Sequence, residues 1–238
     1  MCGIIGVIGG KIPVENVFLG ARDVLKHRGP DDAGIFYQPQ ESVALGFRRL
    51  SIIDISPAGH QPFESADGRF VLVYNGELYN YVELKEELRG SYNFKTHTDT
   101  EVLLASYIKW GEACLDRFVG MYGFAIYDRH EEKLFAARDR LGIKPFYYSV
   151  KNDQFYFASE IKGLLALGIA AKPDDSIIFD YLQFGFYDHR PETFFAGISM
   201  LRPGEALRFK KGKLDVWRYW DLVKVRNVPL CDINNPQA

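Results

Sequence analysis

The chain has 238 residues, of which 47% are hydrophobic and 25% are charged, so it is long enough for one large domain or two small ones with a sizeable core. Its net charge of −2 argues against a nucleic-acid partner or an anionic membrane surface. No apolar run approaches the ~18 residues that cross a bilayer, so no membrane partner is expected. The three cysteines are far apart, which argues against a disulfide framework and favours a reducing, cytoplasmic location.

Hydrophobic periodicity predicts the elements of the first half of the chain. Residues 2–10 form an apolar strand that ends in a Gly-Gly turn, and residues 14–25 have the apolar spacing of an amphipathic helix. Further strands are predicted at residues 34–37, 42–52 and 69–75. Two helices are expected next, capped by Asn80 and Thr98, because a glutamate follows each cap three residues later.

The second half alternates shorter elements. Strands are predicted at residues 121–128, 133–139, 145–148 and 154–159, helices at 160–167 and 175–184, and a hairpin at 205–220. Many strands in meandering order with helices grouped around them indicate an α+β fold of stacked antiparallel sheets covered by helices. Residues 227–238 lose this periodicity and are typical of a linker or tail.

Cys2 is the first candidate for chemistry. Removal of Met1 would place its thiol beside a free α-amine, which is a general base within the same residue. A cysteine at this position without any role is the alternative, and the first two residues alone favour that alternative. The five histidines have no metal-ligand spacing, so no metal site is expected.

A thiol nucleophile needs an oxyanion hole and groups that position the substrate. Asn75 and Gly76 end a strand and supply an amide and a flexible backbone N–H, although an ordinary Asn-Gly turn is the alternative. Arg48 and Arg49 alternate along a strand, so one can reach a site while the other faces solvent; two solvated arginines are equally compatible with the pattern. Asp99 opens a helix, where it either binds an ammonium group or complements the helix dipole.

The segment at residues 139–148 mixes charges with a glycine turn and a proline. We interpret it as a tight turn between strands in which Arg138, Asp139 and Arg140 pair with one another, rather than as a catalytic segment.

Nine motifs taken together carry a family resemblance, and they occur in this order: MCGIIGV, HRGPDDAG, RRLSIID, HQPF, YNGELYN, HTDTEVLL, GMYGFAIYD, RDRLGIKPFYY and FASEIKGLL. The chain resembles the class II glutamine amidotransferase domain, an N-terminal nucleophile hydrolase, and most closely the glutaminase half of glutamine-hydrolysing asparagine synthetases. The resemblance runs from Cys2 to about Trp220. It implies a four-layer αββα sandwich at residues 1–220, followed by a linker or tail at 221–238.

The resemblance also implies a role for each site residue. Cys2 would be the nucleophile, and Asn75 with the backbone of Gly76 would form the oxyanion hole. Arg49 would bind the α-carboxylate of L-glutamine, while Glu77 and Asp99 would bind its α-ammonium group. The pocket would be lined by the backbone of Leu50, Ser51, Ile52 and Ile53. The implied reaction hydrolyses glutamine to glutamate and ammonia through a Cys2 thioester, without a metal or cofactor in this domain.

A partner is implied as well. Asparagine synthetases carry a second domain that uses ATP and Mg²⁺ and has an SGGxDS loop, which this sequence lacks. The synthetase domain is therefore expected in the rest of a longer chain or in a separate subunit, and the ammonia acceptor stays open. A homodimer is one possible assembly. Two other functions remain as alternatives: a non-catalytic docking or regulatory module with the same fold, and an amidase for an amide other than glutamine.

Overall fold

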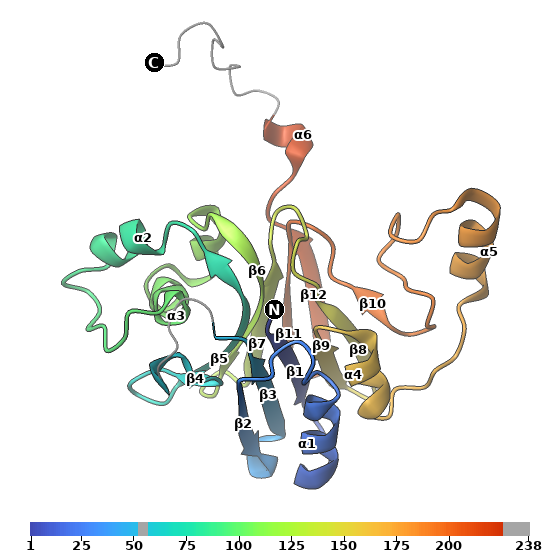
Figure 1. The fold of residues 1–238 in the computed structure, drawn as a ribbon, viewed down its shortest axis with the longest axis horizontal. Helices are drawn as coiled ribbons and strands as arrows, with labels where there is room; N and C mark the ends of the chain where they lie inside the picture. Colours follow the sequence, from blue (N-terminus) through green and yellow to red (C-terminus); the bar gives the residue numbers. More distant parts are fainter. Residues whose placement is uncertain (52–56, 226–238) are drawn as a thin grey trace, which may run out of the picture.

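The computed structural model describes residues 1–51 and 57–225, which form two stacked six-stranded sheets (Figure 1). Every strand pairing in it is antiparallel within the described residues. The first sheet has the order β10 (Ser199–Met200), β8 (Tyr147–Lys151), β9 (Gln154–Ala158), β1 (Gly3–Ile8), β3 (Val43–Arg49) and β2 (Asp32–Gln38). The second has the order β12 (Lys213–Arg218), β11 (Glu205–Lys210), β7 (Lys133–Arg138), β6 (Gly120–Asp128), β5 (Phe70–Leu78) and β4 (Phe63–Glu64).

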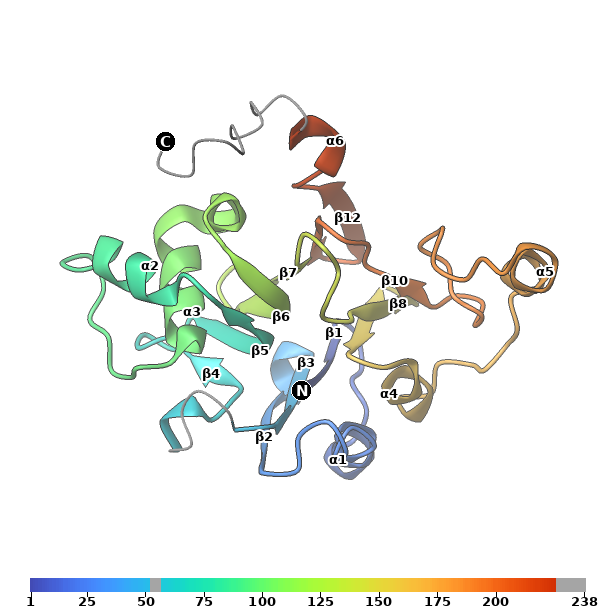
Figure 2. The same cartoon turned by 45° about the horizontal axis from the view of Figure 1, so that its top comes forward.

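Helices cover the outer face of each sheet, which gives four layers. Helices α1 (Glu15–Asp23) and α4 (Ile161–Ala166) cover the first sheet, and α2 (Tyr81–Glu87) and α3 (Asp99–Trp110) cover the second (Figure 1). Helix α5 (Asp175–Phe184) stands apart from the sandwich in both views, and the short α6 (Leu222–Val225) follows β12 (Figure 2). The predicted α+β sandwich of antiparallel sheets is confirmed.

Three apolar clusters hold the layers together. The cluster between the sheets, here called the inter-sheet core, includes Ile4, Ile8, Val43, Leu45, Phe47, Val71, Val73, Ala125, Phe157 and Phe209. A second cluster joins α2 and α3 to the outer face of their sheet, and a third joins α1 and α4 to the other sheet. Because each sheet is buried on both faces, its central strands are continuously apolar rather than alternating.

Successive side chains of strand β1 point to opposite faces of the sheet, so they belong to different clusters. Ile4 belongs to the inter-sheet core, whereas Ile5 belongs to the cluster under α1 and α4. Gly6 lies so close to Phe157 that a Cβ atom would come within 2.2 Å of its ring. The strand is therefore packed tightly on both sides, which fixes the beginning of the chain in the middle of a sheet.

Most predicted elements are present, and two caps differ in detail. Helix α5 matches the predicted residues 175–184, and the last hairpin turns at Lys211 and Gly212 as expected. Thr98 accepts a hydrogen bond from the Glu101 N–H, but the Glu101 carboxylate binds the N–H groups of Lys95 and Thr96 instead of completing the capping box.

Other parts of the secondary structure differ from the prediction or lie outside the described residues. Asn80 precedes α2, yet its side chain bonds to Arg117 and Val119 on a neighbouring loop rather than capping the helix. Strands β4 and β10 are only two residues long, so they leave no periodic signal in the sequence. The predicted tail at residues 227–238 lies outside the described residues.

Candidate active site

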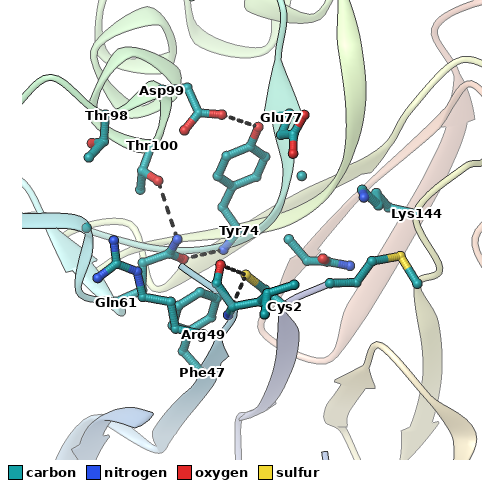
Figure 3. A pocket seen from close by; sticks show the side chains of 15 residues that line it. Cys2, Phe47, Arg49, Gln61, Tyr74, Glu77, Thr98, Asp99, Thr100 and Lys144 are labelled. Atoms are coloured by element: carbon teal, nitrogen blue, oxygen red, sulfur yellow. Dashed lines mark hydrogen bonds between the residues drawn. The ribbon is translucent and has the colours of Figure 1, made fainter. Parts of the chain in front are cut away.

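A cavity of about 80 Å³ lies at one end of the sandwich, where both sheets and the start of α3 meet (Figure 3). The end of β3, the end of β5, the residue before β1 and the loop after β7 all contribute to it. Its walls include Cys2, Phe47, Arg49, Leu50, Gly59, Gln61, Tyr74, Asn75, Gly76, Glu77, Thr98, Asp99, Thr100 and Lys144. Six of the predicted site residues besides Leu50 are thus brought together from four segments that are distant in the sequence.

Strand alternation explains why these side chains reach one place. Phe47 faces the inter-sheet core, so Arg49, two residues later on β3, faces the same way. Val73 likewise faces that core, and Asn75 follows it on β5. Cys2 comes two residues before Ile4 and packs against the same core. The site is the polar end of an otherwise apolar layer.

The Cys2 thiol is held against the backbone of Leu50. The Leu50 N–H donates to Sγ at 3.4 Å, and Sγ lies 3.7 Å from the Leu50 carbonyl oxygen (Figure 3). Burial raises the pKa of this thiol, while the Leu50 N–H, the positive chain terminus and the Arg49 and Lys144 charges act in the opposite direction. The thiolate is therefore favoured by the positive groups that surround it and opposed by its burial.

Arg28 ties the start of the chain to α4. Its Nε donates to the Cys2 carbonyl at 2.8 Å, and its Nη1 donates to the Glu160 carboxylate at 2.9 Å. Burial of Glu160 acts against ionisation, but hydrogen bonds from Arg28, His27 and Lys162 lower its pKa to about 2. The pair is therefore charged at neutral pH, and it fixes a backbone that would otherwise fray.

Asn75 carries the most unusual polar group of the site. The residue is 1% exposed, and neither Nδ2 nor Oδ1 has a hydrogen-bond partner among the residues that the structure describes. Burying an amide without a partner costs about 1–3 kcal/mol. Such a group at the wall of a cavity is explained when a ligand atom supplies the missing hydrogen bond.

Gly76 next to it is required by its surroundings. A Cβ atom at this position would lie 2.4 Å from the Met121 carbonyl oxygen and 2.6 Å from the Tyr74 ring. Asn75 and Gly76 both belong to β5, where Asn75 pairs with Gly123 and Gly76 pairs with Tyr122 of β6. The Asn-Gly pair therefore continues a strand, and the alternative of a two-residue hairpin turn is wrong.

Arg48 and Arg49 are both buried, which corrects the expectation that one or both face solvent. Each is 7% exposed. Arg48 faces the α1 side, where its Nε donates to the Gly29 carbonyl at 3.1 Å and its Nη1 lies 3.6 Å from Asp23. Arg49 lines the cavity, and Gly59 leaves room for its guanidinium, since a Cβ there would lie 2.0 Å from Nη2.

Asp99 and Glu77 bring negative charge to the cavity. The Tyr74 hydroxyl donates to Asp99 Oδ2 at 2.9 Å (Figure 3). The Leu78 N–H donates to the same oxygen at 3.0 Å. Burial raises the pKa of the Asp99 carboxyl, and these two donors only partly offset it. Glu77 is half-buried at the end of β5. The cavity thus has cations and anions on different walls.

The four predicted backbone positions after β3 are not all equivalent. Leu50 lines the cavity and contacts the thiol. Ser51 is not among the lining residues, and its N–H donates to Asp31 at 2.8 Å. Ile52 and Ile53 lie outside the described residues.

Several lining residues were missed by the sequence reasoning. Gln61 accepts a hydrogen bond from the Tyr74 N–H at 2.7 Å and reaches Thr100 at 3.4 Å, which links the second sheet to α3. Lys144 comes from the segment that we interpreted as a plain turn. Nothing in the local pattern marks these residues, because each acquires its role from contacts with distant segments.

Two kinds of feature are absent from the parts of the chain that are described. Residues 1–51 and 57–225 contain no group of three or more His, Cys, Asp or Glu side chains placed to hold a metal ion. Over the same ranges no helix has the length and apolarity needed to cross a membrane.

Comparison with known proteins places the chain in a family. The sequence profile of the family described as "Glutamine amidotransferase domain" matches residues 1–220. The glutamine-hydrolyzing asparagine synthetase 3 of Bacillus subtilis (strain 168) is 39% identical over 229 residues, covering 93% of this chain and 37% of that protein. A putative glutamine-hydrolyzing asparagine synthetase 2 of Methanocaldococcus jannaschii is 37% identical over 244 residues, covering 93% of this chain and 47% of the relative.

A solved structure shows the same fold at lower identity. The glutamine phosphoribosylpyrophosphate amidotransferase from B. subtilis, complexed with ADP and GMP, aligns with a TM-score of 0.65 at 22% identity, covering 92% of this chain and 49% of the other. The chain spans between about a third and a half of the length of the asparagine synthetases described above. It belongs to the glutamine amidotransferase domain family, in the class II group with the N-terminal nucleophile hydrolase fold.

Proposed function

We propose that this domain hydrolyses L-glutamine to glutamate and ammonia through a thioester on Cys2. The observation that carries the proposal is the buried, unpartnered Asn75 amide in the same cavity as the Cys2 thiol. A donor without a partner beside a nucleophile fits an oxyanion hole, which is occupied only when the carbonyl oxygen of a substrate becomes negative. A metal or cofactor has no part in this chemistry.

The proposed reaction needs the α-amine of Cys2, and therefore the removal of Met1. The amine takes the thiol proton, and the sulfur attacks the side-chain amide carbon, so that an S–C bond forms and the carbonyl electron pair moves onto oxygen. The amine returns its proton to nitrogen as the C–N bond breaks and ammonia leaves. Water then adds to the thioester and gives a proton to the amine, and the C–S bond breaks to release glutamate and restore the thiol.

The charges of the cavity fit the other end of glutamine. Arg49 can hold an α-carboxylate in a bidentate manner, and Asp99 and Glu77 can hold an α-ammonium group. An amidase acting on an uncharged acyl amide would have no use for this arrangement. A non-catalytic docking module would have no use for the thiol and the unpartnered amide.

We further propose that the ammonia passes to an ATP-dependent synthetase domain, with aspartate as the first acceptor to be tested. The support is the similarity to relatives named glutamine-hydrolyzing asparagine synthetases, of which this chain matches less than half the length. ATP and Mg²⁺ belong to that second domain in the proposal. A homodimer and a cytoplasmic location remain predictions.

Substitution of Arg49 tests the assignment of glutamine as the substrate. Arg49→Ala is expected to lower kcat/KM for glutamine about 10–100-fold, mainly through KM, because a charge-assisted bond to the carboxylate contributes about 1.5–3 kcal/mol. Steady-state glutamate release measures it. The matched control is 4-aminobutanamide, which is glutamine without its α-carboxylate.

The control separates substrate recognition from folding. Wild type and Arg49→Ala should turn over 4-aminobutanamide at nearly equal, low kcat/KM, because the analogue has nothing for Arg49 to bind. An equal loss with both substrates would mean that Arg49 only supports the fold. A wild type that prefers the analogue would assign the protein to the alternative class of amidases.

Asp99 gives a prediction on pH. As the pH falls through the raised pKa of this carboxyl, Asp99 becomes neutral and loses its attraction for the substrate ammonium. The KM for glutamine should therefore rise toward acid pH, starting above the ordinary range near pH 4. In Asp99→Asn the KM should be about 10–100-fold higher at neutral pH and nearly flat over that acid range. Parallel KM profiles for the two proteins would rule out the assigned role.

A further inference from the structure

The Asp99 carboxylate is held on one oxygen by two donors from the same strand. The Tyr74 hydroxyl donates to Oδ2 at 2.9 Å, and the Leu78 N–H donates to the same atom at 3.0 Å. Both donors belong to β5, so this strand restricts the direction of the carboxylate. Because a carboxylate oxygen has two lone pairs, these donors occupy Oδ2, and Oδ1 is the oxygen left to accept a hydrogen bond from a ligand.

The Tyr74 hydroxyl can only act as a donor here. Tyr74 is 2% exposed, and burial together with the Asp99 charge raises the pKa of its hydroxyl far above the ordinary value. The hydroxyl therefore keeps its proton throughout the pH range of an assay. A hydrogen bond to an ionised acceptor is stronger than one to a neutral acceptor. The contact is thus strongest when Asp99 is ionised, which is the form that attracts an ammonium group.

The backbone of Tyr74 is itself fixed to the beginning of α3. Its N–H donates to Gln61 Oε1 at 2.7 Å, and Gln61 Nε2 donates to the Thr100 hydroxyl at 3.4 Å (Figure 3). Tyr74 is therefore joined to the first two residues of the helix, to Asp99 through its hydroxyl and to Thr100 through Gln61. These bonds make a closed frame between β5 and α3, in which the hydroxyl is the part that touches the carboxylate.

Strand β5 also carries the group proposed for the other end of the substrate. Asn75 directly follows Tyr74, and neighbouring side chains of a strand point to opposite faces. Tyr74 belongs to the cluster under α2 and α3, yet both residues line the same cavity. In the proposed function Asn75 binds the amide oxygen and Asp99 binds the α-ammonium group. One strand therefore sets the relative positions of the groups that bind the two ends of the substrate.

We propose that Tyr74 is a positioning residue that acts through Asp99, because its hydroxyl directs the carboxylate toward the α-ammonium group of the substrate. The inference rests on the proposed function for the role of Asp99. It deepens that function by assigning the selection of amino-acid amides, over amides that lack the amino group, to the contact between Tyr74 and Asp99. A hydroxyl that only satisfied a buried carboxylate would affect stability and leave this selection unchanged.

The loss of the hydroxyl should act on one class of substrate. In Tyr74→Phe, kcat/KM for glutamine should fall about 3–10-fold, mainly through KM, because a charge-assisted hydrogen bond no longer holds the carboxylate. With 4-carbamoylbutanoate, which is glutamine without its α-amino group, the variant should match wild type. In an Asp99→Asn background Tyr74→Phe should add no further change with glutamine, because the charge that it positions has gone.

The pH profile should move as well. The Tyr74 hydroxyl partly offsets the effect of burial on the pKa of Asp99, so without it that pKa should lie higher. As the pH falls, the KM for glutamine should therefore begin to rise at a higher pH in Tyr74→Phe than in wild type. The substitution leaves in place the other charged and titratable groups of the cavity, which are the chain-terminal amine, Cys2, Arg49, Glu77 and Lys144.

The test compares wild type with Tyr74→Phe and uses Tyr107→Phe as the matched control. Tyr107 is 5% exposed and belongs to the same cluster, where its ring packs on Phe70 and Phe135. Its substitution removes the same hydroxyl from α3 at a distance from Asp99 along the helix. Each processed protein is titrated calorimetrically with glutamate and with glutarate, which is glutamate without its amino group. Thermal unfolding of the three proteins reports their stability.

The proposal predicts that Tyr74→Phe weakens glutamate binding about 3–10-fold and leaves glutarate binding unchanged, whereas Tyr107→Phe matches wild type with both ligands. An equal loss for both ligands would overturn the proposal, as would the same loss in Tyr107→Phe or a wild type that binds glutamate no better than glutarate. Titration needs no turnover. A wild type that binds glutamate but does not hydrolyse glutamine would count against the proposed function, while the titrations still decide the role of Tyr74.

Discussion

Asn75→Ala is expected to lower kcat for glutamine hydrolysis about 10²–10³-fold, with a much smaller change in KM. Removal of one oxyanion-hole donor typically has an effect of this size, because the hydrogen bond forms fully only in the transition state. The amide is well placed for such a role, since it is buried at the cavity wall without a partner within the described structure. Steady-state kinetics with glutamine measure the change.

The stability of the same variant provides the control. In the unliganded protein Asn75 makes no side-chain hydrogen bond to a described residue, so its loss removes a desolvation penalty and leaves only a small cavity. The free energy of unfolding should therefore stay within about 1 kcal/mol of wild type or increase. Loss of activity together with a large loss of stability would indicate a structural amide instead, and retained activity would remove Asn75 from the oxyanion hole.

The position of Arg49 could be predicted from the sequence because it depends on local alternation. Once β3 is recognised, the inward-facing Phe47 fixes the side chain two residues later. The burial of Arg48 could not be predicted in this way. Its partners, Gly29 and Asp23, belong to α1 and the loop after it, and only the packing of that helix on the sheet brings them close.

The anchoring of the chain terminus was only partly predictable. An apolar strand after Cys2 indicated that the end of the chain joins a sheet, and β1 lies between β9 and β3 as a central strand. The second attachment, from Arg28 to the Cys2 carbonyl, joins residues 26 positions apart. A contact of this kind has no periodicity and therefore leaves no signal that a sequence pattern can show.

The turn after β7 could also be predicted only in part from the sequence. The glycine and proline correctly predicted a turn, and the adjacent charges suggested mutual ion pairs. In the structure Arg138 and Asp139 bind backbone groups, and they fix a lysine that faces the cavity. Composition indicates that charges are present, but the direction of each side chain is set by the fold.

Cys2→Ala is expected to lower glutamate release by about 10⁴-fold or more, which is the order found when a catalytic nucleophile is removed. The remaining groups of the cavity stay in place, so the variant should still bind glutamate. Its fold should also be retained, because Cys2 only partly packs against the inter-sheet core. Isothermal titration with glutamate checks that the binding site is intact, and thermal unfolding checks the fold.

The state of the chain terminus has to be known in these assays. The proposed base is the α-amine of Cys2, so protein that keeps Met1 should be inactive even with the thiol present. Mass analysis of the terminal peptide in each preparation identifies the processed fraction. The rate of glutamate release should scale with that fraction.

The central claim is that Cys2 cleaves glutamine, and glutamate release by processed wild type and Cys2→Ala tests it most directly. Both proteins are assayed with glutamine, alone and together with a synthetase partner domain. The account predicts steady release by wild type and only background release by Cys2→Ala in both settings. Equal release by the two proteins, or none above background from wild type in either setting, would contradict it.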